Sequence, residues 1–358
     1  MKMKPRTGDL FAGQHRLQKL TQYTKVLDSL TQLVDWPALA QVVNEATGRE
    51  APRPQGGRPP YPTEAMLKII VLQQLYGNLS DEETEYALLD RGSWQRFIGL
   101  EDARDLPDAR TIWAFKNQLA TALPERPHGS GATAVFADVQ RQLNGAGLIA
   151  KGGQMIDATI VTAPKVHLDK EEKERIDRGE TPTHWSQKQI AHIDTDAHWT
   201  AKRKQWHFGY KAHANVDQKH KLVRHLHITP ANVSDMTTLA PVLDKDRARQ
   251  ASGKTVHADR GYDSAANRKL LKAYQLRDGI ARNDDRKLGD QSAIHGRNKR
   301  LARIRGRVEH VFGCWEKLSG KAIRCIGLIR ARAQITVQVT VYNLRRWVTL
   351  HAQGGLAV

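Results

Sequence analysis

Apolar residues recur at helical spacing through most of the first 145 residues. The stretch from Thr21 to Ala46 has this pattern, and Pro37 divides it into two helices because proline disrupts a helix interior. Ser80 and Glu83 have the spacing of a capping box, which marks the start of another helix. The pattern predicts further helices over residues 64–76, 81–89, 94–98 and 111–119. Residues 1–145 are therefore predicted to form an all-helical N-terminal domain.

The pattern changes after Gly147, where runs of strand length alternate with helical stretches. Strands are predicted over residues 154–161, 206–216, 221–228, 254–259 and 278–281. Helices are predicted over residues 231–243, 264–274, 299–318 and 331–350, and a polar loop over residues 283–298. In the last of these helices, Ile335, Val337 and Val339 alternate as in a strand, but the unbroken length favours a helix.

A charged segment over residues 164–204 interrupts this pattern and is predicted to be a loop-like insertion with one helix near residues 171–178. Outside it, three strands come first, and strands and helices then alternate. This is the order of a ribonuclease-H-like domain, a mixed five-stranded sheet covered by helices. Residues 150–350 are therefore predicted to form an α/β domain of this class. In such a sheet the first and fourth strands are neighbours at the centre.

The composition is that of a globular protein. The chain has 358 residues, of which 40% are hydrophobic, and it contains no run of 18 apolar residues that could cross a membrane. No apolar signal core follows the charged start, so a cytoplasmic protein is expected. Cys314 and Cys325 have the spacing of neither a disulfide framework nor a zinc site.

The charge points to a polyanionic partner. The 56 Lys and Arg residues outnumber the 38 Asp and Glu residues, which gives a net charge of +18. From Gln291 to Val358 there are thirteen Lys and Arg residues against two Glu, or +11 of that excess. Such a charge favours binding to nucleic acid, although it would also suit a ribosomal protein or a general nucleic-acid binder.

Asp259 is the first candidate for chemistry. The strand-like run Val256-His257-Ala258 leads into Asp259, and Gly261 then opens a helix. Open α/β sheets bind ligands and metals at this end of their strands, although a surface aspartate that starts a turn gives the same local pattern. Asp157 lies within the first strand. Because the two strands are predicted to be neighbours, the two carboxylates are expected to converge.

Glu309 is the candidate for a third carboxylate. It is the one acid between Ile294 and Trp315, on the predicted basic helix that would cover the same end of the sheet. An exposed glutamate in an ion pair is the plain alternative. Three carboxylates suit Mg²⁺, and two such ions can activate a water or a 3′-hydroxyl and stabilise the leaving oxygen.

Several basic residues are candidates for contacts with DNA. Lys211 and His213 flank Ala212 on one predicted strand face, where they could reach a phosphate or lie on a solvated face. The residues around Glu309 that are predicted to hold phosphates are Arg303, Arg305, Arg307 and Lys317. Trp199 and Trp206 flank a basic run, and their rings could stack flipped bases, but ordinary packing is the favoured role.

The helical domain has two possible roles. Its short helices and basic loops could contain a helix-turn-helix, in which Arg91 and Arg96 would contact DNA, or the domain could be a scaffold.

A set of short motifs, in a fixed order, resembles DDE transposases of bacterial insertion sequences, of the insertion-sequence-five type. In the helical part these motifs are Gly57-Arg58-Pro59-Pro60-Tyr61-Pro62, Leu79-Ser80-Asp81 and Leu106-Pro107-Asp108-Ala109-Arg110-Thr111. In the α/β part they are Asp157-Ala158-Thr159-Ile160, Trp206-His207-Phe208-Gly209-Tyr210-Lys211-Ala212-His213, Ala258-Asp259-Arg260-Gly261-Tyr262 and Arg307-Val308-Glu309-His310. The resemblance covers nearly the whole chain.

The resemblance implies a DNA transposase with Asp157, Asp259 and Glu309 as catalytic and metal-binding residues. It implies two Mg²⁺ ions, which Mn²⁺ can replace, and double-stranded DNA as the partner, both as the transposon ends and as the target. It also implies a homodimer or larger oligomer on DNA, and a protein associated with the bacterial nucleoid when bound.

The chain departs from the family at the Tyr-Arg-Glu-Lys signature. Arg305 can stand for the arginine, but Ala302 occupies the tyrosine position and Glu316 the lysine position, with Lys317 next to it. Two other functions stay open, namely a DNA-binding regulator of transposition without activity and a ribonuclease-H-like nuclease that cuts without joining.

Overall fold

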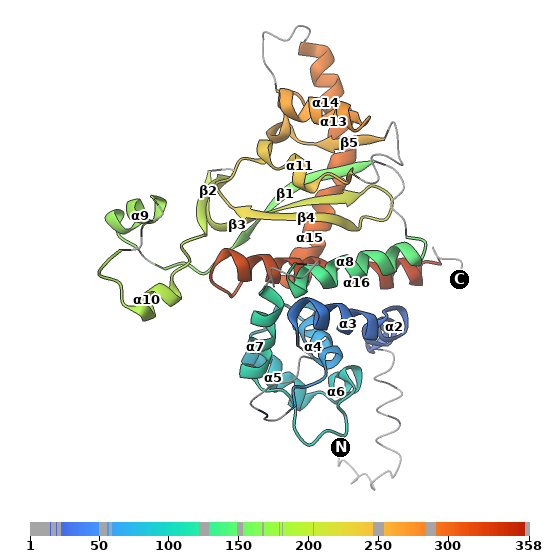
Figure 1. Cartoon of the computed structure of the whole chain (residues 1–358). Helices are drawn as coiled ribbons and strands as arrows, with labels where there is room; N and C mark the ends of the chain where they lie inside the picture. The colour runs from blue at the N-terminus through green and yellow to red at the C-terminus, as the bar shows by residue number, and fades with distance from the viewer. Residues whose placement is uncertain are drawn as a thin grey trace, which may run out of the picture.

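The computed structural model describes residues 15, 19, 23–49, 56, 59–121, 129–148, 153–166, 168–178, 180, 182–202, 204–245, 254–283 and 291–354. A bundle of helices lies at one end and a sheet at the other, with the helices Gly131–Gly145 and Leu328–Ala352 between them (Figure 1). Among the described residues, no helix is both long and apolar enough to cross a membrane.

The N-terminal part is helical, as predicted. Its helices are α2 (Lys25–Leu33), α3 (Trp36–Thr47), α4 (Thr63–Leu75), α5 (Asp81–Asp90), α6 (Gly92–Ile98), α7 (Ala109–Ala120) and α8 (Gly131–Gly145). Pro37 lies in the first turn of α3, where proline is tolerated, and Asp35 caps that helix. The predicted capping box of Ser80 and Glu83 is present at the start of α5.

The α/β part contains a mixed sheet, which confirms the predicted class at that level. Its strands are β1 (Gln154–Thr162), β2 (His198–Lys202), β3 (Gln205–Asp217), β4 (Val223–Pro230), β5 (Thr255–Ala258) and β6 (Arg277–Ile280). The order is β2-β3-β1-β5-β6, with β4 also paired to β3. β1, β2 and β4 pair antiparallel with β3, whereas β5 is parallel to β1 and to β6.

Predictions in this part were wrong at three places. Among the described residues, the sheet has six strands rather than the predicted five. Residues 231–243, predicted to be one helix, contain only the short helices Asp235–Thr237 and Leu239–Val242. β2 lies inside the segment that was predicted to be a loop-like insertion, and its polar residues gave no strand pattern. Residues 291–298 were predicted to be a loop, but they begin helix α14 (Gln291–Arg305). This polar stretch is held by hydrogen bonds rather than by apolar packing, because Arg297 donates to the carbonyls of Asp278 and Ile280 and Asn298 bonds the backbone of Arg282.

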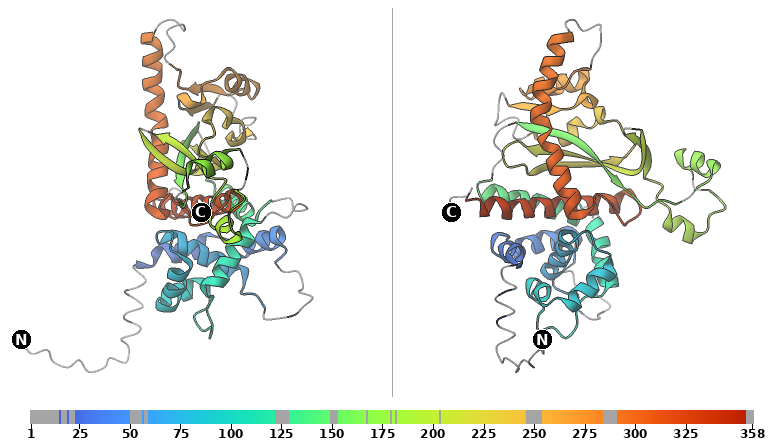
Figure 2. Two further views of the ribbon diagram at one scale, coloured as in Figure 1. Left: turned by 90° about the vertical axis from the view of Figure 1, so that its left-hand side faces the viewer. Right: turned by 180° about the vertical axis from the view of Figure 1, so that it is seen from behind.

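Helices cover both faces of the sheet (Figure 2). One face carries α14 and α15 (Arg307–Ser319), which replace the single predicted helix and are separated at Gly306. The elements associated with the other face are η1 (Asp235–Thr237), α11 (Leu239–Val242), η2 (Arg260–Tyr262) and α13 (Ala265–Ala273). The charged segment before β2 holds α9 (Lys170–Asp177) and α10 (Gln187–His192).

The C-terminal stretch is helix α16 (Leu328–Ala352), as predicted, and it belongs to two cores. Ile335, Val339 and Tyr342 join the core beneath the sheet. Leu344 and Trp347 join the core of the helical part. Because α16 is buried on both of these sides, its apolar residues are not confined to one helical face. This explains why the sequence of this stretch also shows the alternation that is typical of a strand.

Asn343 fastens α16 to the sheet. It is fully buried, its Oδ1 accepts from the Val223 amide at 2.9 Å, and its Nδ2 donates to the Val223 carbonyl at 2.8 Å. Gln140 of α8 donates to the same carbonyl at 2.7 Å. A single side chain of α16 thus satisfies the backbone of β4 where that strand begins.

We expect Asn343→Leu to lower the free energy of unfolding by roughly 1 to 3 kcal/mol, because the Val223 amide would lose its buried acceptor. Urea denaturation followed by circular dichroism measures this. The control is Arg345→Ala on an exposed position of α16, which should change stability by less than about 0.5 kcal/mol. Equal effects of the two substitutions would contradict the role of Asn343.

Candidate functional site

Asp157 and Asp259 lie level with each other on neighbouring strands. β1 and β5 are parallel, with Gln154 beside Val256 and Met155 beside His257. Counted on from these two pairs, Asp157 within β1 comes level with Asp259, which follows the last residue of β5. The negative charge of Asp259 raises the pKa of Asp157, so the two carboxylates are close enough to interact. The prediction that the first and fourth predicted strands are neighbours is confirmed.

Asp157 is a largely buried carboxylate with a cation on one side. Its Oδ2 accepts from Nη1 of Arg305 at 2.8 Å, and its Oδ1 accepts from the Ala158 amide at 2.8 Å. Burial raises the pKa of Asp157 to about 6, against the lowering effect of Arg305. The carboxyl can therefore gain or lose a proton near neutral pH, and nearby cations decide which form prevails.

Asp259 closes the turn that follows β5. Its Oδ1 accepts from the Gly261 amide at 2.9 Å, which caps η2. Burial raises its pKa, and Asp235 raises it further. A Cβ on Gly261 would lie 3.0 Å from Oδ1 of Asp259 and 3.3 Å from Oδ2 of Asp235, so the two carboxylates face one small space that a glycine leaves open.

Asp235 was not among the predicted site residues, and it belongs to the surroundings of Asp259. It follows β4 closely and lies in η1. An acid shortly after the carboxyl end of a strand is the same signal that singled out Asp259. What the sequence could not provide is the packing of η1 against η2, which brings the two loops together.

Lys211 and His213 both turn toward Asp235. Nζ of Lys211 donates to Oδ1 of Asp235 at 2.9 Å and to the Val233 carbonyl at 2.8 Å. His213 is fully buried, and its ring nitrogens lie 3.0 to 3.3 Å from the hydroxyls of Thr229, Tyr262 and Thr238. Burial lowers the pKa of His213 to about 4, so its ring is neutral near pH 7. The His213 ring is therefore enclosed by these hydroxyls and is not exposed toward a phosphate, the partner predicted for it.

A basic pocket of about 560 Å³ opens beside Asp259. Its cationic lining consists of Arg260, Lys299 and Arg305, and Asn298 and His295 complete its polar wall. Arginine and lysine side chains beside carboxylates suit a phosphate that must be held close to an acidic centre.

Glu309 is exposed on α15, while Val308, Val311 and Phe312 of that helix face the core. Within the described part of the chain, no group of three or more His, Cys, Asp or Glu side chains is close enough to hold a metal ion. The structure therefore brings Asp157 and Asp259 together and does not join Glu309 to them. Two neighbouring carboxylates fit a hard divalent cation in their chemistry, and they are two of the three predicted ligands.

The other predicted DNA contacts lie in different places. Arg303, Arg307 and Lys317 are exposed on α14 and α15. Arg91 and Arg96 are exposed at α6, at the far end of the helical part (Figure 1). The guanidinium of Arg91 lies over the rings of Trp94 and Tyr76, at 5.1 and 5.6 Å from their centroids. Trp94 is itself buried, so it supports this surface rather than forming it.

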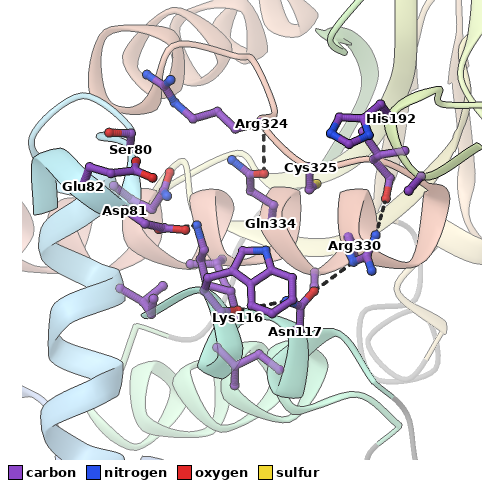
Figure 3. Close-up of a pocket in the computed structure, with 18 residues that line it drawn as sticks. Ser80, Asp81, Glu82, Lys116, Asn117, His192, Arg324, Cys325, Arg330 and Gln334 are labelled. Carbon is purple, nitrogen blue, oxygen red and sulfur yellow. Dashed lines mark hydrogen bonds and ion pairs between the residues drawn. The ribbon is translucent and has the colours of Figure 1, made fainter. Parts of the chain in front are cut away.

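A second pocket, of about 630 Å³, lies between α5, α7, α10 and α16 (Figure 3). Its polar side chains are largely paired with one another. Lys116 contacts Asp81 at 2.5 Å, and Nε of Arg330 donates to Asn117 at 2.8 Å. This pocket shares no lining residue with the pocket at Asp259, and its bonds tie the helical part to α16.

Comparison with known proteins gives two matches. A family model described as a transposase DDE domain matches residues 150–344, which is more than half of the chain. A model described as a transposase domain (DUF772) matches residues 15–118. No solved structure matches the chain.

The raised pKa of Asp157 predicts a pH-dependent loss of stability. Between about pH 4 and the folded pKa of about 6, the folded state binds more protons than the unfolded state, so stability falls as the pH rises. The shift corresponds to roughly 3 kcal/mol, and this part of the pH dependence should be absent in Asp157→Asn. Urea denaturation in EDTA at several pH values measures how the free energy of unfolding depends on pH in the wild type and in Asp157→Asn.

Glu316→Gln is the control for this measurement. Because Glu316 is exposed, loss of its carboxylate should leave the pH dependence of the free energy of unfolding unchanged. Parallel curves for the wild type and Asp157→Asn would show that the Asp157 carboxyl is not perturbed.

Proposed function

The chain belongs to the family of transposases with a DDE domain, and on this premise we propose that it binds the ends of an insertion sequence, cleaves them and joins them to target DNA. The observation that carries the proposal is the pair of interacting carboxylates Asp157, within β1, and Asp259, directly after the neighbouring strand β5, inside the matched domain. The fine assignment to the insertion-sequence-five type and to the ribonuclease-H-like class belongs to the same proposal, supported by the strand order of the mixed sheet.

The proposed chemistry is two phosphoryl transfers. In the first, water attacks the phosphate at the end of the element, the P–O3′ bond breaks, and a 3′-hydroxyl is released. In the second, that hydroxyl attacks a target phosphate, a new P–O3′ bond forms, and a target 3′-oxygen leaves and takes up a proton. No covalent intermediate with the protein is required.

We propose that Asp157, Asp259 and Glu309 hold divalent metal, Mg²⁺ in the cell, with Mn²⁺ as a substitute. When bound, the metal would activate the attacking oxygen and stabilise the leaving one. The partial burial of Asp157 and Asp259 supports this, because a cation would favour the ionised form of carboxyls whose pKa values burial raises.

The chain's own cations would position the DNA. Arg260, Lys299 and Arg305 line the pocket beside Asp259, where they would hold the phosphate that is cleaved. Lys211 is fixed by Asp235 and the Val233 carbonyl, so its side chain would lose little further conformational freedom if it contacted DNA. Arg303, Arg307 and Lys317 would extend this surface along α14 and α15.

We also propose that residues 1–145 bind DNA or mediate dimerisation and that residues 150–350 carry out catalysis, since the two family models divide the chain in a similar way. Two ends must be held at once for joining, so a dimer or larger assembly on DNA is expected. A regulator without activity and a nuclease that does not join are the alternatives to this proposal.

We expect Asp157→Asn and Asp259→Asn each to reduce cleavage by more than roughly 100-fold, because each removes a proposed metal ligand. The assay mixes purified protein with the element's ends and Mg²⁺ and resolves cleaved and joined products. The matched control is Glu316→Gln, an exposed acid two turns after Glu309, which should retain activity. Cleavage without joined products would support the nuclease, and tight binding without cleavage would support the regulator.

The same assay tests the third ligand. Glu309→Gln should reduce cleavage as deeply as the two aspartate substitutions. If Glu309→Gln remained active while Asp235→Asn was inactive, the third position would belong to Asp235, the carboxylate beside Asp259 and Gly261.

A further inference from the structure

The β2–β3 hairpin carries an exposed aromatic face. In its register, Trp199 lies opposite Phe208 and Ala201 lies opposite Trp206. Because alternate and directly opposed residues share a face of a sheet, all four side chains are on one side. The ring centroids of Trp199 and Phe208 are 5.3 Å apart, yet Trp199 remains 44% exposed and Trp206 is 67% exposed.

Ordinary packing, the role favoured from the sequence, does not account for these two indoles. Trp185 shows what a packed indole looks like in the same part of the chain, since it is 6% exposed and its N–H donates to Glu172 at 2.7 Å. Phe208 does pack against the core beneath the sheet. Trp199 and Trp206 extend the same face outward into solvent, where an uncovered apolar surface marks a binding site.

The surroundings of this face are cationic. Nζ of Lys165 lies 5.1 Å from the centroid of the Trp199 ring. Lys202 and Lys204 are exposed at the tip of the hairpin, and residues 198–209 contain no Asp or Glu. Aromatic rings beside lysines, without acids, are the combination that binds single-stranded nucleic acid, in which bases stack and phosphates contact the cations. An apolar protein partner would gain nothing from the lysines.

The hairpin leads to the candidate site. β3 continues from the hairpin to Ala214, which shares the face of Trp206 by alternation and is paired with Asp157. Gly209 is the last residue of β3 that pairs with β1 on the way to the hairpin, and its φ is +149°. An ideal Cβ there would lie 2.2 Å from the Val161 carbonyl oxygen, so only glycine fits this close approach of the two strands. Lys202 at the tip is also among the charges that lower the pKa of both Asp157 and Asp259.

We propose that the face formed by Trp199 and Trp206 stacks unpaired bases of the DNA strand next to the phosphate that is cleaved. This inference rests on the proposed function, because it assigns the position of the substrate at the same site. Stacking would hold a frayed or single-stranded segment away from the duplex and leave the phosphate accessible to the carboxylates. The face would accept any base, because every base offers an aromatic surface.

The test measures binding of a fluorescent twelve-nucleotide oligo(dT) and of a blunt duplex of equal length by fluorescence anisotropy at fixed salt. We expect Trp206→Ala and Trp199→Ala to weaken oligo(dT) binding about 10-fold each and duplex binding by less than about 2-fold. Trp206→Phe should retain most of the affinity, since it keeps a ring. The matched control is Trp113→Ala on α7, an indole of similar exposure at 56% that is absent from the hairpin.

The proposal would be overturned if Trp206→Ala and Trp199→Ala bound oligo(dT) like the wild type, or if they weakened oligo(dT) and duplex binding equally. It would also be overturned if these variants lost self-association, which would assign the face to a second copy of the chain. Binding by Asp259→Ala separates this proposal from the proposed function. That variant should bind oligo(dT) like the wild type while it fails to cleave. If it cleaved normally, the transposase assignment of Asp259 would fail, whereas the stacking result would stand.

Discussion

The burial of α16 on opposite sides is the constraint on which the rest of the structure depends. One side closes the core beneath the sheet, and the other closes the core of the helical part. The polar side chains that α16 buries need hydrogen-bond partners inside the protein, and two of them bond to backbone groups. Asn343 binds both polar groups of Val223, and Gln338 donates to the Ala322 carbonyl at 3.0 Å. The sheet, the loop before α16 and the helical bundle are thereby fixed to one element. α15 packs against both α16 and β1, and α14, which carries Arg305, precedes it along the same face.

The candidate site balances burial against charge. Burial moves the pKa values of Asp157 and Asp259 upward, Asp259 raises the pKa of Asp157 further, and Asp235 does the same for Asp259. Arg305 and Lys202 act in the opposite direction on both carboxyls. A phosphate that approached two ionised carboxylates alone would be repelled, so an enzyme of this kind needs cations around the acids as much as the acids themselves. The late concentration of basic residues in the sequence supplies them, because α14 lines the pocket beside Asp259 with Lys299 and Arg305.

The sequence could predict those parts of the site that depend on local pattern. Alternating apolar runs located β1, β3, β4, β5 and β6, and the rule that acids follow strand ends singled out Asp259. Two other features depend on tertiary contacts that no local pattern carries. Asp235 meets Asp259 because η1 packs on η2, and Arg305, predicted as a phosphate contact, bonds Asp157 across 148 positions of the chain. β2 and the start of α14 were missed for a related reason, since both are polar segments held by strand pairing or side-chain hydrogen bonds rather than by an apolar face.

The composition of the sequence changes at residues 145–150, but residues from both sides of this boundary pack in the same core. The core of the helical part contains Val341, Leu344 and Trp347, which come from the far end of the sequence. Arg330 of α16 bonds Asn117 of α7, and Arg324 donates to the Asn78 carbonyl at 3.1 Å. Removal of the helical part would therefore expose one side of α16 and break these bonds, and α16 in turn supports α15 and the sheet core. The helical part and the elements next to Asp157 thus pack on the same helix, although the DNA contacts predicted for the helical part lie at the opposite end of the molecule.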